Sequence, residues 1–243
     1  MHFDLSEVAA VASTGNLARF DTYATIHKAL RLRMGDLLAA TGRLDCANDS
    51  KVARHCAELA AFLDFCTAHL EHENAFIHPA LEARAERSSR RIADEHVDHS
   101  RDIAVLHRCV EALTCSAAAE RPILARSLYQ TFALFMAHNL LHMYIEETDH
   151  NRTLWKHYSD AELLSIHQRL LAHISPANMA YAIRYMLPAM TPQERAATMA
   201  GVQADAPATA VEGLMTLARE VLPADDFAAL AATLQTNPCL QEK

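Results

Sequence analysis

Apolar side chains recur at intervals of three and four residues along almost the whole chain. This is the period of an α-helix, whereas a half-buried β-strand would alternate at every second residue. The sequence of 243 residues holds only 5 Gly and 8 Pro, and most of the Pro lie beyond residue 170. With so few helix-breaking residues, we expect long helices joined by short connections. We therefore expect an all-α protein.

Four long helices are expected in the first two thirds of the chain. They cover residues 16–40, 51–85, a segment from the turn at 86–91 to 115, and 122–149. Asn16 is a suitable N-cap, Thr41-Gly42 ends the first helix, and Pro122 stands at a first helical position. Short connections between long helices predict an up-down-up-down four-helix bundle. We place this bundle in a domain of residues 1–158.

Shorter helices are expected in a second region, residues 159–243, for which the sequence indicates no role. Ser159 with Glu162 and Thr191 with Glu194 each form the pattern of a capping box, which marks a helix start. Together with several Pro residues, these signals predict a smaller region of short helices after the bundle.

Composition excludes several classes of function. The net charge of -8 and the absence of a basic block argue against nucleic-acid binding. The start of the chain has no signal-peptide pattern, and the most apolar stretch, 128–145, contains His138 and His142, so we expect a cytoplasmic protein that binds no membrane.

Six Cys residues form no C-x-x-C pair and are expected to be free buried thiols. The sequence contains no phosphate-binding Gly loop and no nucleophile motif, so it does not indicate a kinase, nuclease or hydrolase.

The chain holds 15 His, and some of them lie on the apolar faces of the predicted helices. In the second helix, His69 and Glu73 share a face with Leu59 and Phe62. In the fourth helix, the pair His142 and Glu146 lies on an equivalent apolar face. An ionised carboxylate in a bundle core costs several kcal/mol unless it is paired or binds a metal.

The other two helices add imidazoles to the same core. The first carries His27, and the third carries His96 and His99. The order His, then His-x-x-x-Glu, thus occurs twice and predicts two half-sites that face each other. Imidazole and carboxylate ligands suit Fe, Mn or Zn, and six or seven ligands exceed what one tetrahedral zinc uses. Two metals bridged by Glu73 and Glu146 fit better, with non-haem iron as the natural candidate and another divalent metal as the alternative.

This layout resembles the hemerythrin-like (HHE) domain over residues 16–155. Two motifs carry the resemblance: His69-Leu-Glu-His-Glu73, followed by Phe76-Ile-His-Pro79-Ala-Leu, and His142-Met-Tyr-Ile-Glu146-Glu147. The resemblance implies a four-helix bundle with an oxo- or hydroxo-bridged pair of iron ions. The implied ligands come from all four helices: His27, His69, Glu73, His96 or His99 or both, His142 and Glu146. The chain departs from the family at His72, where a carboxylate is common, and in the three-residue spacing of His96 and His99.

The remaining His residues are assigned to other roles. His99 is either a ligand or a hydrogen-bond donor to one. His138 is either a ligand or a residue that forms hydrogen bonds within the core. We expect plain polar contacts for His55 and His107. Several others are expected to be solvated: His2, His78, His150, His157, His167 and His173.

Reversible binding of O2 or NO, for sensing, storage or protection, is the function that the resemblance implies. Ferritin-like oxidases use four carboxylates with two Glu-x-x-His motifs, and this chain has only one, Glu147 to His150. A di-iron peroxidase or ferroxidase is an alternative. Another is an iron-responsive regulatory protein that forms a homo-oligomer or binds a protein partner through residues 159–243.

Overall fold

The computed structural model describes residues 19–236, and all regular secondary structure within that range is helical. The expectation of an all-α protein is therefore confirmed. The described chain forms two compact units. The first contains residues 19–24 and 33–178, and the second contains residues 25–32 and 179–236. Asn16, the expected cap of the first helix, lies outside the described residues.

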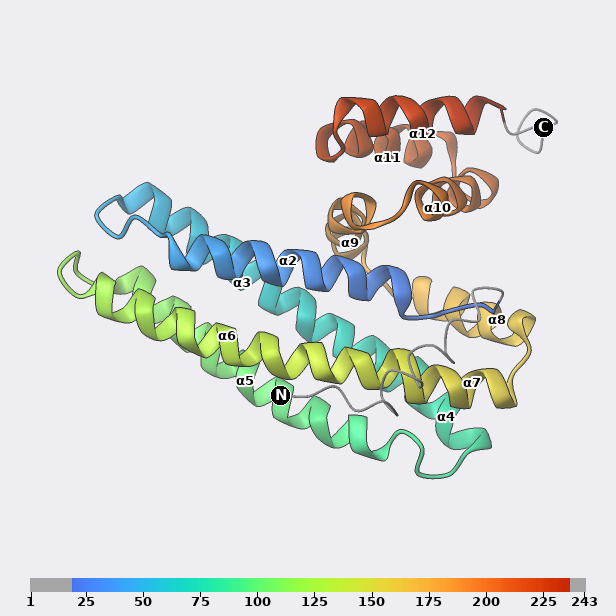
Figure 1. The fold of residues 1–243 in the computed structure, drawn as a ribbon, viewed down its shortest axis with the longest axis horizontal. Coiled ribbons are helices and arrows are strands. Elements are labelled where there is room, and N and C mark those ends of the chain that lie inside the picture. The colour runs from blue at the N-terminus through green and yellow to red at the C-terminus, as the bar shows by residue number, and fades with distance from the viewer. Residues whose placement is uncertain (1–18, 237–243) are drawn as a thin grey trace, which may run out of the picture. The chain divides into compact units, whose positions relative to one another are not determined.

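Three long helices form the body of the first unit: α3 (Asp49–His72), α5 (Arg90–Cys115) and α6 (Arg121–Ile145). In Figure 1, α3 packs along α5 and α5 along α6, and successive helices run in opposite directions. Helix α2 (Ala24–Gly42) belongs to this unit at its two ends and to the second unit between residues 25 and 32. As expected, Pro122 lies in the first turn of α6.

Helices α3 and α6 each pass into a π-helical segment of five residues. These segments are η1 (Glu73–Ile77) and η2 (Glu146–His150), and α4 (His78–Arg84) and α7 (Asn151–His157) follow them. In each, the backbone carbonyl of the Glu accepts a hydrogen bond from the N–H five residues later. The helical run that was expected to end at Asp149 therefore continues to His157. Wide π-turns inside α-helices are frequent at functional sites.

Apolar side chains between α3, α5 and α6 form the core of the first unit. Leu59, Phe62, Leu106, Leu128 and Phe132 are fully buried. The rings of Phe62 and Phe132 meet edge to face with centroids 6.2 Å apart, a favourable aromatic geometry. This close packing fixes the relative rotation of the three helices, and with it the side chains that each helix directs inward.

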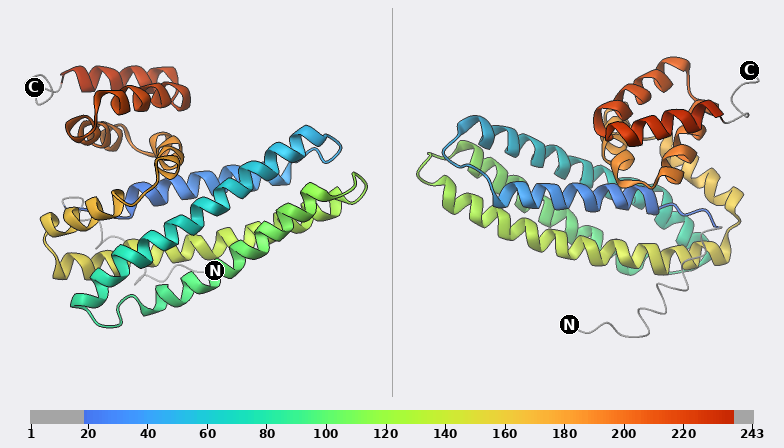
Figure 2. Two further views of the ribbon diagram at one scale, coloured as in Figure 1. Left: turned by 180° about the vertical axis from the view of Figure 1, so that it is seen from behind. Right: turned by 45° about the horizontal axis from the view of Figure 1, so that its top comes forward.

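Helix α8 (Asp160–Leu171) packs on one end of the first unit. Its Leu163 and Ile166 are buried with Leu81 of α4 and Leu154 of α7. The hydroxyl of Tyr158, just before α8, donates a hydrogen bond to the carbonyl of Ala80 at 2.6 Å. The first compact unit thus extends beyond the domain boundary that we expect at residue 158. Figure 2 shows α4, α7 and α8 at the same end.

The second unit contains helices α9 (Pro176–Ala189) from residue 179 on, α10 (Pro192–Asp205), α11 (Ala208–Val221) and α12 (Ala224–Thr236). Leu187, Met199 and Ala218 lie in its core. Residues 25–32 also belong to it, and the ammonium group of Lys28 in this segment lies 2.7 Å from the carboxylate of Glu194. Both expected capping boxes are present, at the start of α8 and of α10.

Two further expectations concern the thiols and the membrane. Among the Cys residues that the structure describes, all are free, but only Cys56 and Cys66 are buried, and Cys115 is exposed. Within residues 19–236, no helix has both the length and the apolar character that crossing a bilayer requires.

Candidate metal centre

Four of the expected metal ligands converge in the first unit. Glu73 of η1, His96 of α5, His142 of α6 and Glu146 of η2 each offer a ligand atom within 4.8 Å of the others, and all four are buried. We refer to these residues as the four-residue group. The two acids stand at the first position of the two π-helical segments. The fold therefore joins both His-x-x-x-Glu motifs with an imidazole from the helix between them.

The inward nitrogen atoms of the two imidazoles are close to each other and to both acids. His96 Nε2 lies 3.1 Å from His142 Nε2, 3.5 Å from a carboxylate oxygen of Glu73 and 3.7 Å from one of Glu146. His142 Nε2 lies 3.4 Å from the same oxygen of Glu146. None of the four side chains is more than 4% exposed. Four potential metal-binding atoms thus surround one buried position.

Outward hydrogen bonds fix the orientation of both rings. His96 Nδ1 lies 2.8 Å from the amide oxygen of Asn74, and His142 Nδ1 lies 3.0 Å from a carboxylate oxygen of Glu95. Both oxygens are acceptors, so each ring donates its Nδ1–H outward. Nε2 of each ring then points inward and can bind a metal once it carries no proton, which is the arrangement of a metal-ligating histidine.

The electrostatics of the group favour a cation. Burial by itself lowers the pKa of His142, but Glu146, Glu73 and Glu95 outweigh burial and raise this pKa to about 9. A site that holds a proton on a buried imidazole this strongly also attracts a metal ion, because both interactions come from the same carboxylates.

The other expected ligands lie nearby or remain predictions. His69 of α3 places Nε2 3.3 Å from Glu73, and its side chain is 14% exposed. His99 of α5 is buried with its ring centroid 4.6 Å from that of His142, but it lies outside the four-residue group. Burial, together with the neighbouring His142 and His96, lowers the pKa of His99 to about 4. His27 is a buried residue of α2 in the segment that belongs to the second unit, so its role as a ligand stays a prediction.

The remaining imidazoles that were assigned from sequence have ordinary partners. His138 is half-exposed beside Asp102 and does not lie in the core. His55 shares a hydrogen bond of 2.9 Å with the hydroxyl of Thr41, and His107 lies 3.2 Å from Asp64. The expectation of plain polar contacts for His55 and His107 is confirmed.

The expectation that His78 and His150 are solvated is wrong. They are only 6% and 2% exposed, and their ligand atoms lie within 4.8 Å of each other and of Glu146. Burial lowers the pKa of both, and that of His78 to about 4. The wide turn explains His78, because the i→i+5 hydrogen bond places it above Glu73, whereas regular α-helical spacing would turn it away. The four-residue interval from Glu146 to His150 was a signal that could have found His150.

Sequence reasoning also missed Tyr23, Asn74 and Glu95. The hydroxyl of Tyr23 lies 3.1 Å from His150 Nδ1. Glu95 precedes His96 on α5, but it bonds to His142 of the neighbouring helix. Spacing along one helix carries no signal for such a contact between helices.

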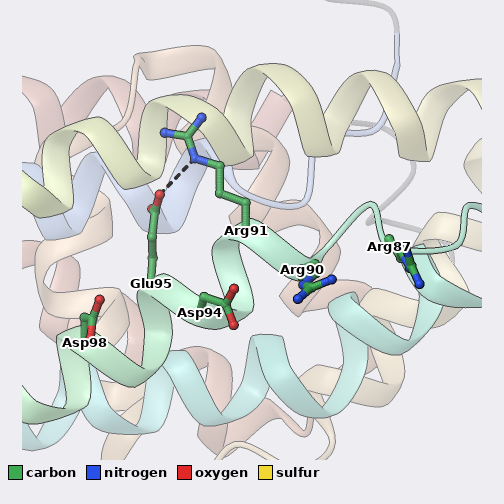
Figure 3. Close-up of a pocket in the computed structure, with 6 residues that line it drawn as sticks. All are labelled: Arg87, Arg90, Arg91, Asp94, Glu95 and Asp98. Atoms are coloured by element: carbon green, nitrogen blue, oxygen red, sulfur yellow. Dashed lines mark hydrogen bonds and ion pairs between the residues drawn. The ribbon is translucent and has the colours of Figure 1, made fainter.

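Glu95 connects the candidate centre with the surface. Figure 3 shows a surface pocket at the start of α5, lined by Arg87, Arg90, Arg91, Asp94, Glu95 and Asp98. Arg91 donates a hydrogen bond to Glu95 at 3.0 Å, while the second carboxylate oxygen of Glu95 accepts from His142. Burial alone raises the pKa of Glu95, but the hydrogen bonds from His142 and Arg91 lower it. Glu95 is therefore a charged partner of the buried ring.

Comparison with known proteins identifies no relative. No protein-family model, curated protein or solved structure matches this chain.

Proposed function

We propose that this chain is a non-haem di-iron protein, similar to hemerythrin-like domains, that binds O2 or NO for sensing, storage or protection. The observation that carries the proposal is the convergence of the four-residue group in a buried space. Without a compensating cation, each buried carboxylate charge destabilises the folded chain by several kcal/mol. Bound metal would remove this cost.

The donor set is compatible with iron as the metal. Imidazole nitrogen with carboxylate oxygen suits iron, manganese or zinc, and the absence of thiolates from the four-residue group argues against a cysteine-type zinc or iron–sulfur site. Glu73 and Glu146 are the carboxylates of the two His-x-x-x-Glu motifs, both lie in the four-residue group, and each could bridge two ions. They would neutralise half of the charge on two ferrous ions.

We further infer that the first unit is an up-down-up-down four-helix bundle whose first helix is α2, of which residues 24 and 33–42 belong to this unit. Tyr23, at the start of α2, bonds to His150, and Thr41, near its end, bonds to His55 of α3. Both residues belong to the first unit.

The surrounding residues would hold the ligands and exclude water. A reduced iron pair, when bound, supplies an open coordination position for a small diatomic molecule. Asn74 and Glu95 orient the rings of His96 and His142. Phe135 is buried with its ring centroid 6.1 Å from that of His99, and it contributes an apolar lining beside the site.

Metal analysis after anaerobic purification tests the proposal. We expect an iron pair in each chain, and near-ultraviolet and visible charge-transfer bands when air is admitted. Glu73→Ala should lower the iron-to-protein ratio sharply. His138→Ala is the matched control, because His138 lies on α6 but is half-exposed and outside the four-residue group. An unchanged ratio in Glu73→Ala would contradict the proposal. If the iron-loaded protein turns over hydrogen peroxide continuously and the metal-free protein does not, the protein is a di-iron peroxidase and not a binding protein.

A further inference from the structure

A second group of possible ligands lies beside the four-residue group. His78, the first residue of α4, and His150, the last residue of η2, come together with Glu146. All three are buried, and the ring centroids of the two imidazoles are 5.7 Å apart in an edge-to-face arrangement. Neither imidazole belongs to the set of ligands that the sequence resemblance implies.

The two imidazoles have nitrogen atoms available for binding. Within residues 19–236, Nε2 of His78 and Nε2 of His150 are buried and have no hydrogen-bond partner. A buried polar atom without a partner destabilises the folded chain, so such atoms need an explanation. The two helical runs that carry the His-x-x-x-Glu motifs each contribute one of these nitrogens.

Tyr23 holds one of the two rings in place. Its hydroxyl lies 3.1 Å from His150 Nδ1, and both side chains are buried. A hydrogen bond at Nδ1 fixes the ring so that Nε2 remains the free coordinating atom. This is how residues outside a metal site orient its histidine ligands.

We propose that His78, His150 and Glu146 form a further binding position for a divalent first-row transition metal. Two imidazoles and one carboxylate are the ligand set of many non-haem Fe(II) sites that leave other coordination positions open. The position shares Glu146 with the proposed iron pair but does not require that pair to be filled. Because it has one carboxylate, and that one is shared, we expect it to bind metal more weakly than the four-residue group.

Metal-free full-length protein titrated with Co2+ tests the proposal, because the visible bands of Co2+ report its ligands. We expect His78→Leu and His150→Leu each to bind one equivalent less than the wild type, with the tighter equivalents retained. His55→Leu is the matched control, since His55 is a buried histidine bonded to Thr41 and lies outside all of these groups. Equal stoichiometry in the wild type and both variants would overturn the proposal.

Two further measurements separate this proposal from the proposed iron pair. Glu73→Ala should lose the tighter Co2+ while keeping the weaker equivalent, since Glu73 is not one of the three ligands. If Glu73→Ala changes nothing but His78→Leu loses an equivalent, the iron pair fails and this position stands. Anomalous scattering from Co2+-soaked wild-type crystals should show a peak between His78, His150 and Glu146. This measurement does not depend on the folding of any variant, and a map without that peak would overturn the proposal.

Discussion

The two helical runs that carry the His-x-x-x-Glu motifs differ in how they enclose their ligands. One run is α3–η1–α4 and the other is α6–η2–α7. In the second run, the side chain of His142 is 3% exposed and its Nδ1 bonds to the Glu95 carboxylate, while His69 in the first run is 14% exposed. Glu146 is fully buried and belongs to both the four-residue group and the group with His78. The second run is therefore the more enclosed, and we expect it to dominate metal retention.

The largest effect is expected from Glu146→Ala. This change removes a ligand from both groups at once, so neither the proposed iron pair nor the position at His78 and His150 should retain metal. Glu73→Ala should retain the metal at the second of these positions. Metal-to-protein ratios after reconstitution, with circular dichroism as a check on folding, measure the difference. If the two variants retain equal amounts of metal, the two runs do not differ as we infer.

The next largest loss of metal affinity is expected from changes to Glu95 and Asn74, which hold the rings of His142 and His96. Glu95→Gln keeps the size of the side chain but removes the charge beside His142, and loss of such partners typically weakens metal binding by about 10–100-fold. Asn74→Leu removes a neutral partner of His96 and should cost less. Competition with a chelator gives both affinities. A larger loss for Asn74→Leu than for Glu95→Gln would reverse the ranking.

Metal affinity should depend on pH through His142. Its pKa of about 9 in the metal-free chain means that a proton must leave before the metal binds. Affinity should therefore fall by about tenfold for each pH unit below 9 until another group titrates. In Glu95→Gln, which lacks one of the carboxylates that raise this pKa, the fall should begin at lower pH. Chelator competition across this range measures both profiles, and identical profiles would exclude Glu95 as a cause.

The smallest effect concerns the stability of the metal-free chain. His142 has a folded pKa of about 9, above its ordinary 6.5, so the stability it adds is full below 6.5 and is lost as the pH rises towards 9. His78 and His99 have folded pKa values of about 4, so the unfolded chain binds more protons between pH 4 and 6.5, and stability rises across that range. Urea unfolding should thus show greatest stability near pH 6.5. A monotonic profile would mean that other groups dominate.

Periodicity predicted much of this arrangement, because it depends on which face of a helix is apolar. Spacing within one helix indicates the helical class, the capping box at Ser159, and the apolar face that carries each of the four ligands. The short connections between the long helices then indicate that these faces meet, as Glu73, His96, His142 and Glu146 do. The burial of His78 could not be predicted in this way, because it depends on a π-turn. The bond from Glu95 to His142 crosses between helices, and the packing of α8 depends on tertiary contacts, so neither leaves a local pattern.

The π-turn in η1 also determines whether the chain tolerates the deletion of one residue at this point. Deleting one residue from a regular α-helix rotates everything beyond it by about 100° and takes its apolar face out of register with the core. Within η1, the same deletion would convert the i→i+5 turn into an ordinary α-turn and leave His78 above Glu73. Loss of one codon for Ala75 should therefore be tolerated here, while the same loss in the middle of α3 would not be.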